Sequence, residues 1–184
     1  MTFDPRTFSK PVYAALTDLR KPYDKLWEQA QSDAEKTLYR NHLKEQKNQA
    51  IELYTYLATW GLMRLKAEEM ALDKGKPDRA APKLRKKEDS KLTNQEEPSL
   101  FQRKQEAKNK TGKRKVIIAY FECLQALSAY GETKNLAAPD GLNVLMGLGT
   151  EEYLGLTGLG LALAQEFCFW ATAVYHDISG DDAA

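Results

Sequence analysis

The side chains that could do chemistry in this 184-residue chain are mainly basic, and they are concentrated in one segment. Residues 74–115 hold fifteen lysine and arginine residues against six acidic ones, a net charge of +9. Residues 1–73 hold eleven of each sign, and residues 116–184 hold one basic residue against nine acidic ones, a net charge of −8. This partition favours a polyanion partner or self-association of unlike patches, and the remaining interpretation is a solvated basic loop.

Patterns typical of catalysis or of cofactor binding do not occur in the sequence. A phosphate loop of the form G-x-x-x-x-G-K-[ST] is missing, and the glycines between 147 and 160 never complete G-x-G-x-x-G. His42 and His176 are isolated, and no cysteine pair has metal-ligand spacing. The adjacent carboxylates Glu68 and Glu69 point to different sides of a helix and do not form an acid–base pair. We therefore predict no enzymatic activity, no cofactor and no bound metal.

The elements that must position the basic groups are helices, and the most apolar of them covers residues 150–177. Thr150 is expected to cap its start with a side-chain oxygen, and Glu151 and Glu152 complement the positive end of the helix dipole. From Leu154 onward, apolar or small residues cover nearly every face. A helix of this kind is predicted to be buried, with the other helices wrapped around it.

The alternative interpretation of the same stretch is a transmembrane span from Tyr153 to Tyr175. Glu166 lies at its middle, where a bilayer penalises charge most, and no basic residue flanks either end to set an orientation. We therefore predict a core helix and no membrane partner.

Apolar residues at helical spacing also run through the first part of the chain. A short helix is predicted from Ser9, and Pro22 is expected to break it and to open the next. A long helix is predicted from Ser32 or Asp33 to Leu72, with Gly61 as a point where it bends or packs closely.

The second part of the chain shows the same periodicity after a basic interruption. Residues 75–112 combine lysine-rich stretches with few apolar residues, so we predict a mobile insertion with at most a helical turn near 99–108. Regular helix is expected to resume at Lys113 and to stop at Gly131, followed by a short helix from Pro139 through Met146. No period of two with strand length occurs, so residues 1–184 are predicted to form a single all-α domain, a helical bundle around the buried C-terminal helix.

The two cysteines, Cys123 and Cys168, both lie within apolar helical patterns. Small buried thiols in a reducing compartment fit this placement better than a disulfide. The N-terminal residues lack the charged start and apolar run of a secretory signal. A cytoplasmic protein is the expected localisation.

Three stretches carry a resemblance to a known family. In the C-terminal helix, the relevant residues are Tyr153, Leu156, Thr157, Leu161 to Ala164, Trp170 and Ala171. Earlier in the chain, TYLATWGLMRLKAE contains Gly61, Leu62, Leu65 and Lys66, and Val116 to Leu127 is followed by the Pro139–Met146 segment. Together these stretches resemble the small subunit of type III-B (Cmr) CRISPR–Cas effector complexes, although Gly158 stands where that family usually has a basic residue.

The resemblance implies a non-catalytic, RNA-binding helical subunit of an antiviral defense complex. Such a subunit stacks in several copies alongside the other subunits, and its basic faces line the channel that holds the guide RNA and the target RNA. The basic residues on or next to predicted helices are the expected RNA contacts: Arg40, Lys44, Lys47, Arg64, Lys66, Lys113, Arg114 and Lys115.

A second hypothesis needs no nucleic acid. A helical protein–protein adaptor would hold a partner through the apolar helix and the acidic C-terminal part, with the basic insertion as a solubilising loop. Salt-sensitive binding to single-stranded RNA separates the two hypotheses.

Overall fold

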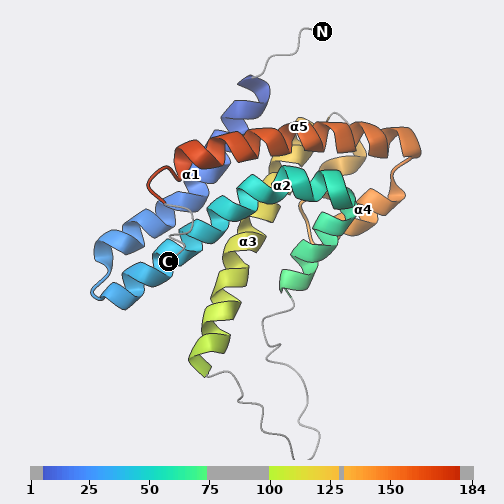
Figure 1. Cartoon of the computed structure of the whole chain (residues 1–184). Helices are drawn as coiled ribbons and strands as arrows, with labels where there is room; N and C mark the ends of the chain where they lie inside the picture. Colours follow the sequence, from blue (N-terminus) through green and yellow to red (C-terminus); the bar gives the residue numbers. More distant parts are fainter. Residues whose placement is uncertain (1–5, 74–99, 129–130, 179–184) are drawn as a thin grey trace, which may run out of the picture.

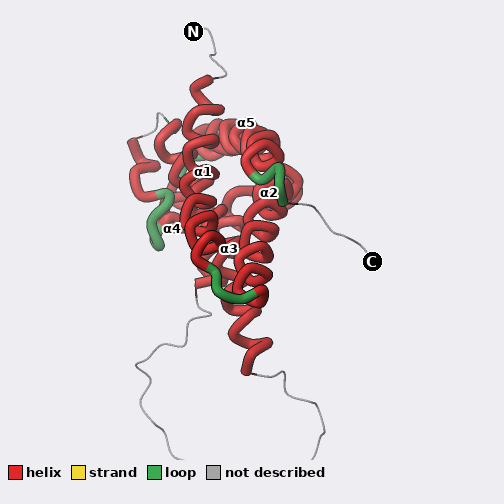
Figure 2. Tube along the Cα trace, turned by 90° about the vertical axis from the view of Figure 1, so that its left-hand side faces the viewer, coloured by secondary structure: helices red, strands yellow, loops and turns green. Residues whose placement is uncertain are grey.

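The computed structural model describes residues 6–73, 100–128 and 131–178, and its regular elements are helices. In chain order they are α1 (Arg6–Gln29), α2 (Asp33–Asp73), α3 (Leu100–Leu127), the 3₁₀ helix η1 (Gly131–Asn135), α4 (Gly141–Gly147) and α5 (Thr150–Val174). Within these ranges the chain contains no strand (Figure 2). The predicted all-α fold is confirmed.

The long helices share one hydrophobic core. α2 packs against α1, α3, α4 and α5, and α5 lies across the other long helices near one end of the molecule (Figure 1). All four long helices contribute large, fully buried apolar side chains: Leu16, Leu53, Leu62, Leu65, Ile117, Tyr120, Phe121, Leu124 and Phe167. Because each such side chain contributes about 1.5–3 kcal/mol on burial, these rows determine which face of each helix turns inward.

α1 differs from the prediction at Pro22, which does not end the helix but lies inside it. Leu16 and Tyr23, on either side of this proline, are both buried against the bundle. Packing on both sides of Pro22 therefore holds the two segments in one helix. The proline itself is exposed, so the carbonyl that it deprives of a partner can bond to water.

α2 confirms the predicted long helix and is bent at Gly61. This residue has φ 77° and ψ 172°, a combination that only glycine adopts readily. A Cβ atom there would lie 3.7 Å from the Tyr153 hydroxyl, an ordinary contact. Backbone conformation, not lack of space, therefore requires glycine at the bend.

α3 begins at Leu100, not at Lys113, so the last part of the predicted insertion 75–112 belongs to a helix. Residues 75–99 of that insertion lie outside the described residues. Val116, Ile117, Tyr120 and Leu124 form the expected buried stripe of α3. The helix ends at Leu127, shortly before Gly131.

α5 contributes to the core as predicted, but only one of its faces is buried. That face consists of Leu156, Gly160, Leu163, Ala164, Phe167 and Ala171. Leu154 and Phe169 lie on other faces and are 64% and 66% exposed. A Cβ atom at Gly160 would lie 2.6 Å from the Tyr120 hydroxyl, so glycine allows α5 to approach α3 closely.

The start of α5 also differs from the prediction. Thr150 is the first helical residue, and the residue before it, Gly149, makes no side-chain cap. The Glu152 carboxylate instead accepts a hydrogen bond of 3.0 Å from the Gly149 amide. An acid in the first turn therefore satisfies this helix start, where a hydroxyl was expected.

Candidate nucleic-acid interface

The eight predicted RNA contacts lie on two helices. Arg40, Lys44, Lys47, Arg64 and Lys66 are on α2, and Lys113, Arg114 and Lys115 are on α3. Their surroundings differ widely, so the structure divides them into exposed groups, groups held by other side chains and one buried group.

Lys66 is the buried group, and its prediction as an RNA contact is wrong in this structure. Its side chain has no exposed surface, and its Nζ atom lies 2.7 Å from Glu69 Oε2. The same nitrogen donates a hydrogen bond of 3.2 Å to the Ala137 carbonyl and lies 5.1 Å from the centroid of the Phe121 ring. An ammonium group enclosed in this way cannot reach a phosphate, and its role is to join α2 to the segment before α4.

Arg114 shares the carboxylate that holds Lys66. Its Nη2 atom lies 3.1 Å from Glu69 Oε1, so Glu69 bridges cations from α2 and α3. The Glu69 side chain is 4% exposed and that of Arg114 is 27% exposed. Arg114 is therefore primarily a structural residue, with only part of its side chain at the surface.

Lys113 and Lys115, the neighbours of Arg114 in the sequence, lie close to residues other than Glu69. Lys115 is exposed, and its Nζ atom lies 3.4 Å from the Tyr23 hydroxyl and 5.3 Å from the centroid of that ring. Lys113 is half-buried and lies close enough to Glu45 to influence the pKa of its carboxyl group. Burial raises the pKa of Glu45, and the positive charge of Lys113 partly offsets that rise.

The basic residues on the first half of α2 lie near the C-terminal turn, residues 175–178, which follows α5. Lys47 donates a hydrogen bond of 2.6 Å to the Ile178 carbonyl, which ties this turn to α2. Lys44 is half-buried, whereas Arg40 is exposed and lines a cavity of about 550 Å³. Of these three residues, only Arg40 is exposed.

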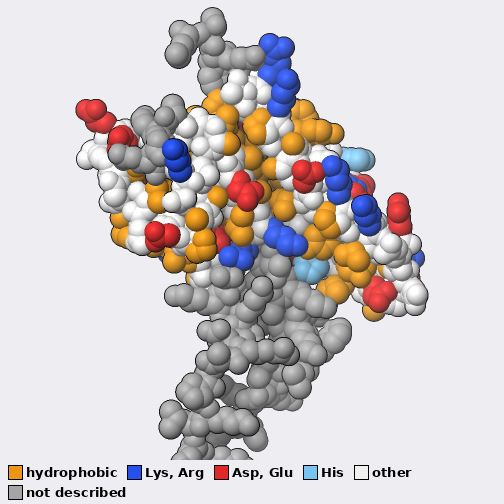
Figure 3. Space-filling view, turned by 180° about the vertical axis from the view of Figure 1, so that it is seen from behind, with side chains coloured by type: hydrophobic (Ala, Val, Ile, Leu, Met, Phe, Trp, Pro, Cys, Tyr) orange, Lys and Arg blue, Asp and Glu red, His pale blue; other side chains and the backbone are white. Residues whose placement is uncertain are grey.

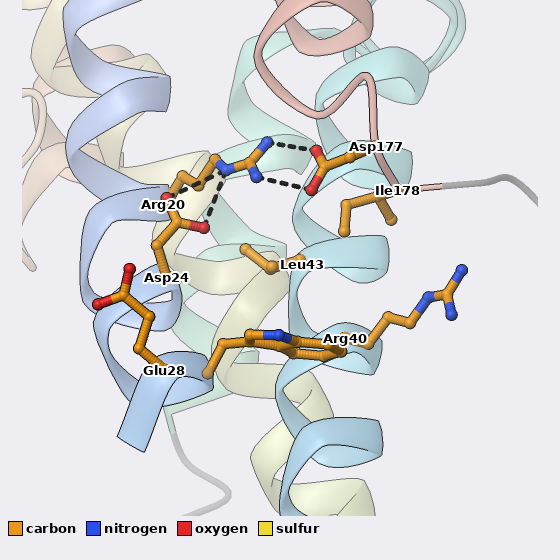
Figure 4. A pocket seen from close by; sticks show the side chains of 8 residues that line it. Arg20, Asp24, Glu28, Arg40, Leu43, Asp177 and Ile178 are labelled. Carbon is orange, nitrogen blue, oxygen red and sulfur yellow. Dashed lines mark hydrogen bonds and ion pairs between the residues drawn. The ribbon is translucent and has the colours of Figure 1, made fainter. Parts of the chain in front are cut away.

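The cavity beside Arg40 contains an ion-pair cluster that the sequence did not reveal. Arg20 makes hydrogen bonds of 2.6 and 2.7 Å to Asp177 and a bond of 3.1 Å to Asp24. The pair with Asp177 raises the pKa of Arg20 and lowers the pKa of Asp177. Figure 4 shows Arg20 between the two carboxylates, with Arg40 pointing away from them.

Arg64 has the clearest geometry for nucleic-acid contact. Its guanidinium carbon lies 4.2 Å from the centroid of the Trp60 ring, and Trp60 is 53% exposed. Arg64 is itself exposed and also interacts with the Tyr56 hydroxyl. A guanidinium placed on an indole can meet a phosphate with its edge or a base with its face. Trp60 was not among the predicted residues, although its position four residues before Arg64 is a readable signal.

Among the described residues, no group of three or more histidine, cysteine, aspartate and glutamate side chains could hold a metal ion. Cys123 and Cys168 are free thiols, as expected from their helical patterns. By length and composition α5 could cross a membrane, a property that core helices of soluble proteins also have, and 33% of its apolar window is buried.

No protein-family model matches the chain, and no curated protein or solved structure is detectably similar to it.

Proposed function

We propose that this chain is a non-catalytic small subunit of a type III CRISPR RNA-guided effector complex, of the III-B (Cmr) kind that its motifs resemble. It stacks in several copies and binds the backbones of the guide RNA and the target RNA through basic side chains, in the cytoplasm. The observation that supports this most is the exposed Arg64 guanidinium stacked on the exposed Trp60 ring. Aromatic and arginine pairs of this kind are typical of surfaces that bind single-stranded nucleic acid.

The exposed and half-exposed cations divide the proposed interface into two parts. Arg40, Lys44 and Arg64 lie on α2, and Lys113 and Lys115 lie on α3. Lys66 and Arg114 are left out because Glu69 holds them in or near the core, and Lys47 is left out because it bonds to the Ile178 carbonyl. Contacts of this type neutralise phosphates without reading sequence.

The test is binding of the full chain to short single-stranded RNAs of unrelated sequence over a range of salt concentrations. For single strands the logarithmic slope is about −0.7 per neutralised phosphate, so five contacts give roughly −3.5. Replacing Lys113 and Lys115 together with Gln should flatten the slope and weaken every RNA about equally. Lys134→Gln, an exposed lysine in the acidic third of the chain, is the matched control and should leave the slope unchanged.

Sedimentation measured in parallel separates RNA binding from assembly. The proposal predicts that the double variant loses RNA affinity while it still self-associates. If self-association alone is lost, these lysines form an assembly surface, and the RNA-binding proposal is wrong at this site. If the unmodified chain does not bind RNA even at low salt, the proposal as a whole is wrong.

A second candidate is the protein–protein adaptor without RNA binding, and one observation favours it. Met146 at the end of α4 is 58% exposed, and Leu154 at the start of α5 is 64% exposed. Large apolar side chains exposed on both sides of one short turn are typical of a contact with another protein. Met146→Ser with Leu154→Ser should then abolish a protein contact and leave RNA binding as it was.

A further inference from the structure

A cluster of aromatic side chains lies on the surface where α1 meets α5. The ring centroids of Tyr13 and Trp170 are 5.1 Å apart, and those of Phe169 and Trp170 are 5.3 Å apart. Both pairs have edge-to-face geometry, with interplanar angles of 63° and 86°. Tyr13 is 49% exposed and Phe169 is 66% exposed, so two of the three rings are open to solvent. We call these three residues the aromatic platform.

The platform is held in place by Glu166, the one charged residue between Tyr153 and Tyr175. The Trp170 indole nitrogen donates a hydrogen bond of 3.2 Å to Glu166 Oε2. The Ser9 hydroxyl donates a hydrogen bond of 2.8 Å to the same oxygen, from α1. Glu166 therefore fixes the orientation of the indole and joins the two helices that carry the rings. A surface whose rings are already oriented loses little entropy when a flat ligand stacks on it.

Basic side chains lie next to the platform on α1. Arg6, Lys10 and Tyr13 are separated by four and three residues, so they form one row along the helix, and all three are exposed. On the face that Figure 3 shows, basic side chains lie among hydrophobic ones. The acid that bonds to the platform is Glu166, whose Oε2 atom accepts two hydrogen bonds.

We propose that the aromatic platform, together with Arg6 and Lys10, is a second RNA subsite that stacks unpaired bases of single-stranded RNA. This proposal rests on the RNA binding proposed above and adds contacts to bases. Exposed rings bind bases of any identity because every base has a π-face, and cations beside the rings hold the phosphates that connect those bases. The cores of protein–protein interfaces are enriched in aromatic residues and arginine but depleted in lysine, so Lys10 is the residue of this surface that favours RNA over a protein partner.

The experiment compares two variants of α5 in the full chain. Phe169→Ser removes a ring of the platform, and Leu154→Ser removes an apolar side chain of nearly equal exposure, 64% against 66%. Each is measured against a single-stranded RNA and against an oligonucleotide of the same length whose sugars carry no bases. Circular dichroism checks that both variants remain folded, as expected for exposed positions.

The expected result is that Phe169→Ser weakens binding to the normal RNA by about 5- to 150-fold, the range for loss of one stacked base. Binding to the abasic oligonucleotide and the salt slope should not change, because the phosphate contacts remain. Leu154→Ser should bind both probes as the unmodified chain does.

Three outcomes overturn the proposal and can be told apart. If Phe169→Ser binds normal RNA as tightly as the unmodified chain, the platform does not stack bases, while the proposed function stands. If the same variant changes sedimentation but not RNA affinity, the platform is a protein contact. If the unmodified chain binds neither probe at low salt, the proposed function fails together with the subsite.

Discussion

Arg64 and Lys66 lie two residues apart on α2, and the structure gives them opposite roles. Positions two apart on a helix point about 200° away from each other, so one faces solvent when the other faces the bundle. Arg64 is exposed above Trp60, whereas Lys66 has no exposed surface and is held by Glu69. The comparison shows that a basic residue near a helix end is not evidence of a binding surface until its face of the helix is known.

The buried face that Lys66 shares with Leu62 and Leu65 was the missing signal. Glu69 follows Lys66 at a spacing that brings the two side chains together, and Leu62 and Leu65 mark the same face as buried. Arg64 also has a carboxylate at helical spacing, Glu68, but its guanidinium lies on the exposed Trp60 ring. The apolar residues that share the face of Lys66, and not the presence of a carboxylate alone, therefore separate the structural cation from the exposed one.

The largest expected effect comes from removing the buried ion pair between Lys66 and Glu69. Glu69→Gln removes the carboxylate charge that Lys66 and Arg114 share, and leaves the buried ammonium group without a counterion. Removal of one partner from a buried pair costs about 3–5 kcal/mol of unfolding free energy. Urea denaturation followed by circular dichroism measures the change. Glu52→Gln, at an exposed position on the same helix, should have almost no effect, and equal losses in the two variants would contradict the assignment.

The next effect tests the bend that precedes Arg64. Gly61→Ala forces a side chain into a backbone conformation with φ 77°, at a cost of about 1–3 kcal/mol. Thermal unfolding measures the loss. Gly158→Ala is the matched control, because a Cβ atom there meets nothing within 4 Å and the substitution removes a flexible residue from α5. It should leave stability unchanged or raise it by about 0.4–1 kcal/mol, and a bend that tolerated alanine equally well would not depend on glycine.

A smaller effect tests the difference between Arg64 and Lys66 through RNA binding. Arg64→Gln should reduce the steepness of the salt dependence of RNA binding by about 0.7, the value for one phosphate contact on a single strand. Lys66→Met should leave this slope unchanged, since its ammonium group does not reach the surface. The measurement is a titration of both variants at several salt concentrations. The reverse pattern, with Lys66 changing the slope, would mean that the helix turns its other face to RNA.

The smallest expected effect concerns the ion pair between Arg20 and Asp177, whose side chains are 17% and 46% exposed. Arg20 lowers the pKa of Asp177 below its ordinary value of 3.8, so the folded chain binds fewer protons than the unfolded chain at this site. The stabilising contribution is therefore present above about pH 4 and is lost as the pH falls through the lowered pKa. The urea midpoint of unfolding should therefore fall less between pH 7 and pH 3 in Asp177→Asn than in the unmodified chain, so that the substitution narrows the difference between the two midpoints. Asp18→Asn, from an ion pair exposed on both sides, is the control and should narrow it less.

Much of the fold could be predicted because it follows from local periodicity. The apolar rows of α2 and α3, the bend at Gly61 and the short α4 are all visible in the spacing of residues. Pro22 was misjudged because long-range packing of Leu16 and Tyr23 outweighs the local preference of proline to end a helix. The one-sided burial of α5 could not be seen, since a helix with apolar residues on every face gives no indication of which face turns inward.

The candidate site was less predictable than the fold. Charge counts indicated basic regions, but burial of Lys66 and the bond between Lys47 and the Ile178 carbonyl depend on segments far apart in sequence. The aromatic platform likewise joins Tyr13 to Trp170, and no spacing rule connects residues on separate helices. These contacts require the tertiary structure, because only packing brings α1 and α5 together.

The pairing of α1 with α5 has a consequence for how the chain is made. Ser9 and Glu166, which bond to each other, are separated by 157 positions, and Arg20 and Asp177 by the same number. During synthesis from the N-terminus, α1 is complete long before its partner helix has left the ribosome. Until α5 is made, it cannot cover Val12 and Leu16, which are buried in the finished protein. A chain truncated before residue 150 would expose this surface and should aggregate, because α5 completes the burial of α1.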